Sequence, residues 1–280
     1  MTYRELCVRL EAAGIENSEW DAACLLSHFT NRAFSAVYTD PEWDYPPSAE
    51  LEAAVCRREK REPLQYVLGT WEFYRQTYEV SPDCLIPRSD TEILVEEAVR
   101  LLPQGALFAD LCTGSGCIAI STLAERPDTR AYALEKFPAT LSLAERNAER
   151  NGVRARLTPI CADVLRKPTI LDGTLDAILS NPPYIATREI DSLSPEVHRE
   201  PLAALDGGED GLLFYRAILQ NWARTLKPNG WILFEIGYDQ ADALRTLGSE
   251  HGFAVSIKRD LGGNDRVAIL TPLNRKDTQH

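Results

Sequence analysis

Short apolar runs alternate with helix-forming segments from residue 106 onward, and this alternation constrains the fold more than any other feature. The apolar runs cover residues 106–112, 130–134, 155–161, 175–180, 231–236, 254–258 and 267–270. The segments between them that favour helix are 117–124, 139–150, 211–226 and 239–251. Apolar strands that alternate with helices form a parallel sheet covered on both faces. Since no helix separates the last two strands, we expect this α/β sheet to end antiparallel.

The first part of the chain favours a small helical bundle. Residues 18–21 resemble a capping box, followed by apolar residues that include Trp20 and Leu25. Ser48 marks a second helix start, and proline-containing segments at 40–41 and 45–47 interrupt the helices. Residues 71–80 predict a short β-hairpin, and residues 91–102 predict a helix that stops at Pro103.

Net charge and composition exclude some classes of function. The net charge is −12, and an acidic surface repels phosphate backbones. No run reaches the ~20 apolar residues of a membrane helix, and residues 1–14 lack a signal-peptide core. We therefore expect a cytoplasmic protein without stable nucleic-acid or membrane binding. The seven cysteines form no CxxC pair, which predicts reduced thiols and no metal site. The lack of a long exposed apolar stripe favours a monomer.

A glycine-rich turn ends the first strand of the alternating region and opens a helix. Its candidate cofactor-binding residues are Asp110, Cys112, Thr113, Gly114, Ser115 and Gly116. Glycine lets the backbone turn sharply and lets a ligand approach closely. The turn matches the dinucleotide fingerprint G-x-G-x-x-A, and it matches equally the acidic-x-x-x-Gly-x-Gly turn of S-adenosylmethionine methyltransferases.

Acidic residues follow the next two strands. Glu135 lies 19 residues after Gly116, where a carboxylate can accept hydrogen bonds from both ribose hydroxyls of either cofactor. Asp163, with Val164 beside it, follows the third strand and is placed to reach an adenine amino group. We expect Glu135, Asp163 and Val164 to bind the cofactor.

The sharpest signal is Asn181-Pro182-Pro183-Tyr184, directly after the fourth strand. The prolines fix φ and remove two N–H donors, which leaves carbonyl groups free to accept hydrogen bonds. The Asn181 side-chain oxygen and the Pro182 carbonyl can each take one N–H of a planar NH2 group, and the Tyr184 ring can stack on its plane. Asn181 also borders the expected cofactor site.

Two acceptors on an amide or exocyclic amine would aim its delocalised lone pair at an electrophilic methyl group. No strong base is needed, because the proton can leave after methyl transfer. We therefore interpret Asn181, Pro182 and Tyr184 as catalytic and S-adenosylmethionine as the cofactor. Both amide-nitrogen and adenine-N6 methyltransferases share this motif, and a non-catalytic cofactor-binding adaptor is a third alternative.

Several segments in order resemble the bacterial release-factor glutamine N5-methyltransferase family over nearly the whole chain. They are residues 62–69, 85–92, 110–120, 180–185, 200–201, 207–212, 235–237, 259–261 and 265–266. The resemblance implies methylation of the glutamine in the Gly-Gly-Gln motif of class 1 peptide chain release factors. An adenine-N6 nucleic-acid methyltransferase is the alternative, which the net charge of −12 disfavours.

The resemblance also implies an architecture. Residues 1–70 would form a helical substrate-docking domain, and residues 71–84 a β-hairpin linker. Residues 85–275 would form a Rossmann-like, seven-stranded methyltransferase domain, followed by a tail over 276–280. Arg88, Asn181, Pro182, Pro183 and Tyr184 would bind the substrate.

Three residues depart from the family pattern. Cys112 replaces the first glycine of the turn, which implies backbone angles that a side chain tolerates. Glu135 replaces the commoner Asp, and Ser89 replaces a proline and would loosen its loop. The basic cluster, defined as Arg57, Arg58, Lys60 and Arg61, predicts either a solvated helix face or a docking patch for an acidic surface.

Overall fold

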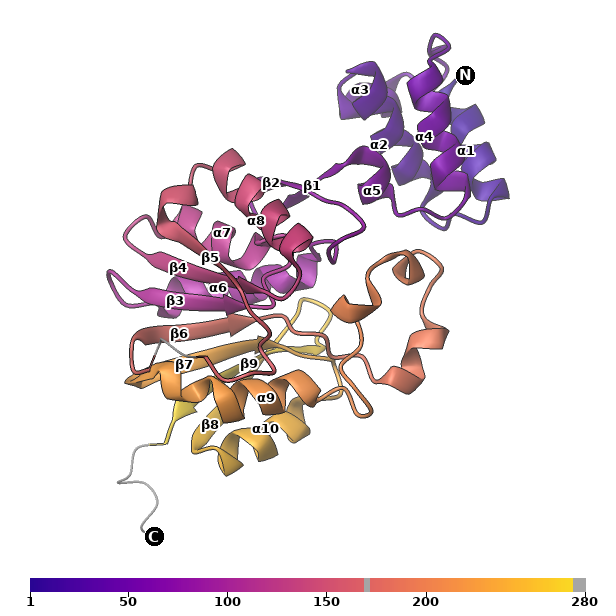
Figure 1. The fold of residues 1–280 in the computed structure, drawn as a ribbon. Coiled ribbons are helices and arrows are strands. Elements are labelled where there is room, and N and C mark those ends of the chain that lie inside the picture. Colours follow the sequence, from indigo (N-terminus) through magenta and orange to yellow (C-terminus); the bar gives the residue numbers. More distant parts are fainter. Residues whose placement is uncertain (169–171, 274–280) are drawn as a thin grey trace. The chain divides into compact units, whose positions relative to one another are not determined.

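The computed structural model describes residues 1–168 and 172–273. The chain divides into two compact units (Figure 1). The first unit combines residues 1–70 with the short segment Ser194–Arg199, and the second contains Trp71–Leu193 and the chain from Glu200 onward. The predicted tail, residues 276–280, lies outside the described residues. None of the described helices is both long and apolar enough to cross a membrane.

The first unit is helical, as predicted. Its helices are α1 (Tyr3–Ala12), α2 (Ser18–Thr30), α3 (Phe34–Thr39), α4 (Ala49–Glu59) and α5 (Leu64–Leu68). The core contains Leu6, Leu10, Leu25 and Leu26, all fully buried. The burial of these leucines is what holds helices of 5 to 13 residues together, since helices this short are marginal alone.

The helix starts in this unit were predicted with mixed success. Ser48 caps α4, because its side chain accepts a hydrogen bond from the Leu51 N–H at 3.2 Å. The capping box expected at residues 18–21 is wrong: α2 begins at Ser18 itself, and its N-cap Asn17 makes no side-chain hydrogen bond. Trp20 is about half exposed, at 49%. The capping box lies instead at Thr2 and Glu5, before α1.

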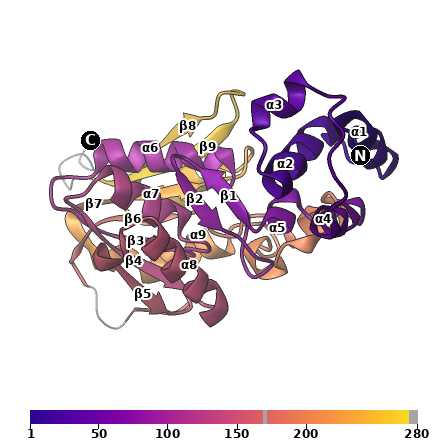
Figure 2. The same cartoon turned by 90° about the horizontal axis from the view of Figure 1, so that it is seen from above.

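The second unit contains a seven-stranded sheet in the order β5-β4-β3-β6-β7-β9-β8 (Figures 1 and 2). The strands are β3 (Leu107–Leu111), β4 (Arg130–Glu135), β5 (Leu157–Cys161), β6 (Leu175–Ser180), β7 (Leu226–Glu235), β8 (Phe253–Arg259) and β9 (Asp265–Pro272). The first five are parallel, and β9 pairs antiparallel with both β7 and β8. The predicted Rossmann-like sheet and its antiparallel end are confirmed.

Helices cover both faces of this sheet. One apolar core joins it to α6 (Glu92–Leu101), α7 (Cys117–Glu125) and α8 (Pro138–Arg150). The other joins it to α9 (Leu213–Asn221) and α10 (Ala241–Glu250). The helix expected over 211–226 is shorter than predicted, because the chain continues from α9 through a 3-10 turn (Ala223–Thr225) into β7.

The predicted hairpin is present as β1 (Thr70–Phe73) and β2 (Gln76–Glu79). Phe73 and Tyr78 belong to the core that contains α6 and α7. The buried Tyr78 hydroxyl lies 2.7 Å from Ser121 Oγ on α7. The hairpin is therefore packed as part of the second unit.

Candidate active site

A cavity of about 530 Å³ lies in the second unit among the loops that follow its parallel strands. The chain passes from β3 outward to β4 and β5 and then returns to β6 on the other side of β3. Ligands of open α/β sheets bind outside the carboxyl ends of the strands at such a switch point. Residues after β3, β4, β5 and β6 all line this cavity.

Asp110 stabilises the glycine-rich turn through hydrogen bonds. Its Oδ2 accepts hydrogen bonds from Thr113 Oγ1 at 2.6 Å and from the Ala119 N–H at 3.1 Å. Gly116 has φ of +84°, and a Cβ there would lie 2.7 Å from the Ile120 side chain. A Cβ on Gly114 would meet nothing within 4 Å, so the turn faces open space where a ligand can approach.

Cys112 takes the place of the missing glycine in the turn. We expected backbone angles that a side chain tolerates, and Cys112 has φ of +60°, in the small left-handed region that few residues other than glycine adopt. The turn therefore keeps the conformation of a glycine while carrying a side chain, at a cost of roughly 1–2 kcal/mol.

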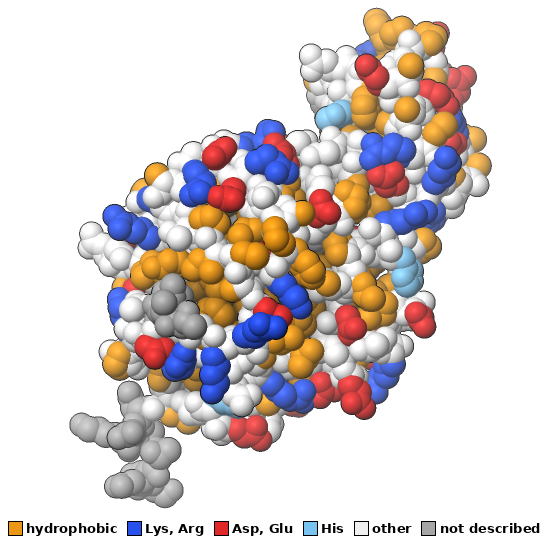
Figure 3. Space-filling view, viewed as in Figure 1, with side chains coloured by type: hydrophobic (Ala, Val, Ile, Leu, Met, Phe, Trp, Pro, Cys, Tyr) orange, Lys and Arg blue, Asp and Glu red, His pale blue; other side chains and the backbone are white. Residues whose placement is uncertain are grey.

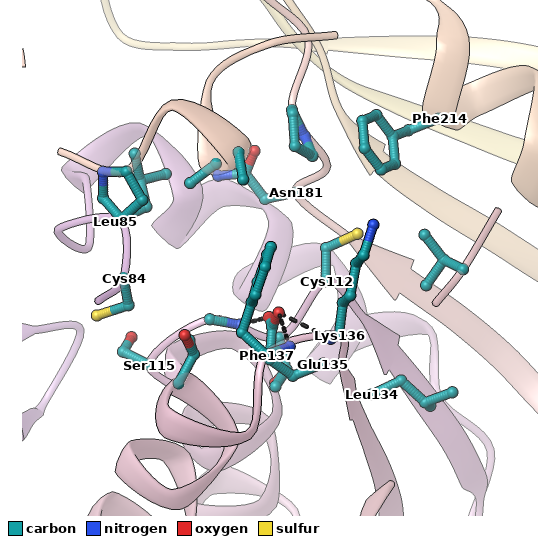
Figure 4. A pocket seen from close by; sticks show the side chains of 18 of the residues that line it. Cys84, Leu85, Cys112, Ser115, Leu134, Glu135, Lys136, Phe137, Asn181 and Phe214 are labelled. Carbon is teal, nitrogen blue, oxygen red and sulfur yellow. Dashed lines mark hydrogen bonds between the residues drawn. The ribbon is translucent and has the colours of Figure 1, made fainter. Parts of the chain in front are cut away.

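Glu135 ends β4, and its carboxylate is fixed by three backbone N–H groups (Figure 4). Oε2 accepts from Gly114 at 3.2 Å, and Oε1 accepts from Lys136 and Phe137 at 2.8 and 3.1 Å. Burial raises the pKa of Glu135, against the effect of these donors. The carboxylate thus couples the glycine-rich turn to the end of β4, and Glu135 lines the cavity.

Asp163 follows β5 and also lines the cavity, next to Val164. Burial opposes its ionisation, but the Leu165 N–H and the Lys136 ammonium lower the pKa of Asp163 overall. The Leu165 N–H donates to Oδ1 at 3.0 Å, and Lys136 Nζ lies 3.1 Å from Oδ2. Asp163 is therefore an ionised acceptor at neutral pH.

Asn181 and Phe214 also line the cavity, and Asn181 lies across it from Glu135 in Figure 4. Its Nδ2 donates to Thr91 Oγ1 at 3.2 Å. The Tyr184 hydroxyl donates to Glu235 Oε1 at 3.4 Å. The two ends of the Asn181–Tyr184 motif are thus tied to side chains from other elements.

Glycines hold the backbone that follows the motif. The Gly207 N–H donates to the Ile185 carbonyl at 2.8 Å, and Gln240 Nε2 donates to the Tyr184 carbonyl at 3.0 Å. A Cβ on Gly207 would lie 2.7 Å from Tyr184 Cα, and one on Gly211 would lie 2.4 Å from the Tyr184 carbonyl oxygen. Only glycine lets residues 207–211 pack this closely.

The structure brings most of the predicted site residues to one cavity. Those that line it are Arg88, Cys112, Thr113, Gly114, Ser115, Glu135, Asp163, Val164, Asn181 and Pro183. Four others do not belong to the lining: Asp110, Gly116, Pro182 and Tyr184. Asp110 is fully buried and supports the turn, and Gly116 is the residue before α7.

Sequence reasoning assigned no role to Thr91, Glu200 or Glu235. Arg88 forms an ion pair with Glu200, whose Oε2 also accepts from the Ile86 N–H at 3.0 Å. These contacts fix the 86–88 segment along the cavity wall. Two sequence features could have pointed to these residues. Glu235 is an acidic residue at the end of an apolar strand, and Thr91 lies in the apolar–acidic pattern of residues 86–92.

The basic cluster is not a free cationic patch. Arg58 is buried and pairs with Asp21 at 2.6 Å and with Glu196 at 3.0 Å. Arg61 pairs with Glu196 at 2.8 Å, and Arg57 with Glu62 at 2.5 Å. Acidic and basic side chains lie next to one another on the visible face of the first unit (Figure 3). Three of the four cations are thus paired with carboxylates of the first unit. Arg57 and Lys60 are exposed, so the solvated-face alternative describes only part of the cluster, and the docking alternative stays a prediction.

The cavity fits S-adenosylmethionine. Its volume lies within the usual range of roughly 300–1,000 Å³ for small-molecule sites. Glu135 offers a fixed carboxylate, Asp163 an ionised acceptor, and Gly114 an open backbone position. The fold and this site define a class of protein, the S-adenosylmethionine-dependent methyltransferases.

This chain is similar to the release factor glutamine methyltransferase of Geobacter sulfurreducens, at 42% identity over 92% of this chain and 91% of that protein. It is also similar to the release factor glutamine methyltransferase of Cereibacter sphaeroides, at 40% identity over 92% of this chain and 93% of that protein. The chain belongs to the release factor glutamine methyltransferase family. Family models match at residues 2–69 (PrmC N-terminal domain) and 89–209 (methyltransferase small domain).

One solved structure, of a release factor-specific protein-(glutamine-N5) methyltransferase from Alicyclobacillus acidocaldarius, is 34% identical. The match covers 70% of this chain and 100% of that one, with a TM-score of 0.41.

Proposed function

We propose that this enzyme transfers the methyl group of S-adenosylmethionine to the side-chain amide nitrogen (N5) of the glutamine in the Gly-Gly-Gln motif of class 1 peptide chain release factors. The observation that carries the proposal is that Asn181 and the Glu135-bound turn line one cavity from opposite sides. Two relatives at 40–42% identity that are named release factor glutamine methyltransferases support the substrate class.

The cofactor would be held by the residues of the turn and the two acidic side chains. Thr113, Gly114 and Ser115 would border it at the end of β3, and Glu135 would accept hydrogen bonds from its ribose hydroxyls. Asp163 would accept from its adenine amino group, with Val164 beside the ring. The bound cofactor supplies an electrophilic methyl group.

The chain's own residues would orient the glutamine amide. Asn181 Oδ1 would accept one N–H of the amide, with Pro183 and Arg88 along the cavity wall. The Pro182 carbonyl and the Tyr184 ring do not line the cavity itself, and they would accept the second N–H and stack on the amide plane where the glutamine enters. This arrangement raises the electron density on nitrogen and directs its lone pair into the cavity. Orientation supplies most of the effect, and the proton leaves to water after transfer.

The helical unit would dock the release factor, because recognition of one glutamine needs contacts away from the reacting atoms. Its free cations are fewer than the sequence suggested, so we expect this docking to use more than charge. The cytoplasm as the place of action and a monomeric state remain predictions.

Peptide mass spectrometry of a release factor treated with enzyme and S-adenosylmethionine tests the proposal. A gain of one methyl mass on the Gly-Gly-Gln glutamine is expected. Methylated adenine in a parallel nucleic-acid assay, with an unmodified glutamine, would contradict it and favour an adenine-N6 methyltransferase.

A further inference from the structure

Hydrogen bonds through Thr91 and Glu235 connect the side chains of Asn181 and Tyr184, the two ends of the motif. Thr91 lies at the end of a 3-10 turn (Ser89–Thr91) before α6, and Glu235 is the last residue of β7. Both are buried, with exposed fractions of 2% and 1%. Thr91 Oγ1 donates to Glu235 Oε2 at 2.5 Å.

We propose that Thr91 and Glu235 are positioning residues that fix which end of the Asn181 amide faces the substrate. This inference rests on the proposed function, and it adds two residues to that site. A threonine hydroxyl has one proton to donate, whereas a carboxylate can only accept. Once Thr91 donates to Glu235, its oxygen can only accept from Asn181.

The direction of these hydrogen bonds decides which atom of the Asn181 amide faces the cavity. Asn181 Nδ2 is committed to Thr91, at 3.2 Å, which leaves Oδ1 as the group that Asn181 offers to the cavity. An amide turned the other way would present its NH2 group to the N–H groups of the substrate amide. The same Glu235 carboxylate accepts from the Tyr184 hydroxyl, so it anchors both ends of the motif.

Ionised Glu235 can only accept, which excludes the reverse direction, whereas a protonated carboxyl could also donate to Thr91. Burial raises its pKa to about 7, while the Thr91 hydrogen bond, Arg266 and Tyr184 lower it and Asp90 raises it. Tyr215 from α9 and Cys117 from α7 also interact electrostatically with Glu235. Assays of these hydrogen bonds should therefore be run at pH 8.5, where the Glu235 carboxylate is charged.

Thr91→Val keeps the shape of the side chain and removes its acceptor. We expect about a tenfold lower kcat on a release factor, with unchanged S-adenosylmethionine affinity by calorimetry. Thr91→Ser should stay within about threefold of wild type, and Glu235→Leu should lose at least as much kcat as Thr91→Val, because it also removes the partner of the Tyr184 hydroxyl. Thr225→Val is the matched control, because Thr225 is similarly buried and its hydroxyl donates to the Trp222 carbonyl, away from the Asn181–Tyr184 motif.

A double-mutant cycle separates positioning through Asn181 from a general structural effect. Thr91→Val should cost nothing further in an Asn181→Ala background, and a further tenfold loss there would overturn the inference. So would an unchanged kcat in Thr91→Val itself.

A spectroscopic readout keeps the inference testable without turnover. The Asn181 side-chain amide signal in a ¹H–¹⁵N spectrum, identified by its loss in Asn181→Ala, should shift in Thr91→Val and stay in Thr91→Ser. An unshifted signal would overturn the inference. A wild-type enzyme that leaves the release factor unmodified would instead contradict the proposed function, and the spectrum would still decide the orientation of Asn181.

Discussion

At the scale of single residues, Cys112 carries a side chain in the backbone conformation of a glycine, with φ of +60°. Cys112→Gly should change the free energy of unfolding by less than about 1 kcal/mol, because relief of the left-handed penalty is offset by the entropy cost of glycine and by the lost packing of the Cys112 side chain against the core. Cys112→Val should lower it by about 2 kcal/mol, because a β-branched side chain tolerates this region worst. Urea denaturation measures both, and equal stability of the two variants would contradict this account of the turn.

Asn181 is expected to act on turnover and not on cofactor binding. Asn181→Ala removes one oriented acceptor, so kcat on a release factor should fall by about two orders of magnitude. The affinity for S-adenosylmethionine, measured by calorimetry, should stay within about twofold, because Glu135 and Asp163 are untouched. A variant with wild-type turnover would remove Asn181 from the mechanism.

Asp110 should make the protein less stable as the pH rises. Burial raises its pKa to about 7, while Thr113 and the Ala119 N–H lower it and Glu135 raises it. The folded state therefore holds a proton that the unfolded state has released, and stability on the order of 4 kcal/mol is lost between about pH 4 and pH 7. The other titratable groups that interact with Asp110 are Tyr78, Cys112 and Cys117.

Urea titrations at pH 5, 6, 7 and 8 measure this loss. The Asp110→Asn variant, which cannot ionise, should have a flatter profile than the wild type over this range. Parallel profiles for the two proteins would show that Asp110 titrates normally in the fold.

At the scale of elements, the loop 207–211 holds the substrate motif through backbone contact. Gly211→Ala would place a Cβ 2.4 Å from the Tyr184 carbonyl oxygen. We expect at least a tenfold loss of kcat, since Tyr184 and Asn181 belong to the same rigid segment. Gly252→Ala is the control: its φ of +80° is similar to the +73° of Gly211, but its Cβ would meet nothing within 4 Å. Equal activity of the two variants would rule out the contact as the cause.

Elements were predictable where their signal is local. The apolar runs identified every strand of the large sheet, and the prolines of the Asn181–Tyr184 motif identified its loop, because both depend on neighbours in sequence. The partners of Asn181 were not predictable. Thr91 and Glu235 lie 90 and 54 residues from it in sequence (181 − 91 and 235 − 181). The pairing of β6 with β7 brings Glu235 close to Asn181, and the packing of α6 on the sheet brings Thr91 there.

The ion-pair partners of the basic cluster were not predictable for the same reason. Arg58 follows a helical pattern that equally suits a solvated face, and its partner Glu196 lies 138 residues away.

The left-handed Cys112 is a different case. A sequence shows that a glycine is missing but does not show whether the backbone keeps the glycine conformation.

At the scale of the whole molecule, the segment Ser194–Arg199 makes the first unit depend on a distant part of the chain. Arg58 is buried between Asp21 and Glu196, so Arg58→Met leaves Asp21 without its counter-charge. We expect the free energy of unfolding to fall by about 3–5 kcal/mol. Arg4→Met, which breaks the exposed pair with Glu42, should change it by less than about 1 kcal/mol. Similar losses in the two variants would refute a buried network.

The most direct test of methyl transfer to glutamine is a stoichiometric measurement with labelled S-adenosylmethionine. Wild-type enzyme should add one labelled methyl group per release factor, and none to a release factor whose Gly-Gly-Gln glutamine is replaced by alanine. Label in the alanine-substituted release factor, or in nucleic acid in place of protein, would contradict the account.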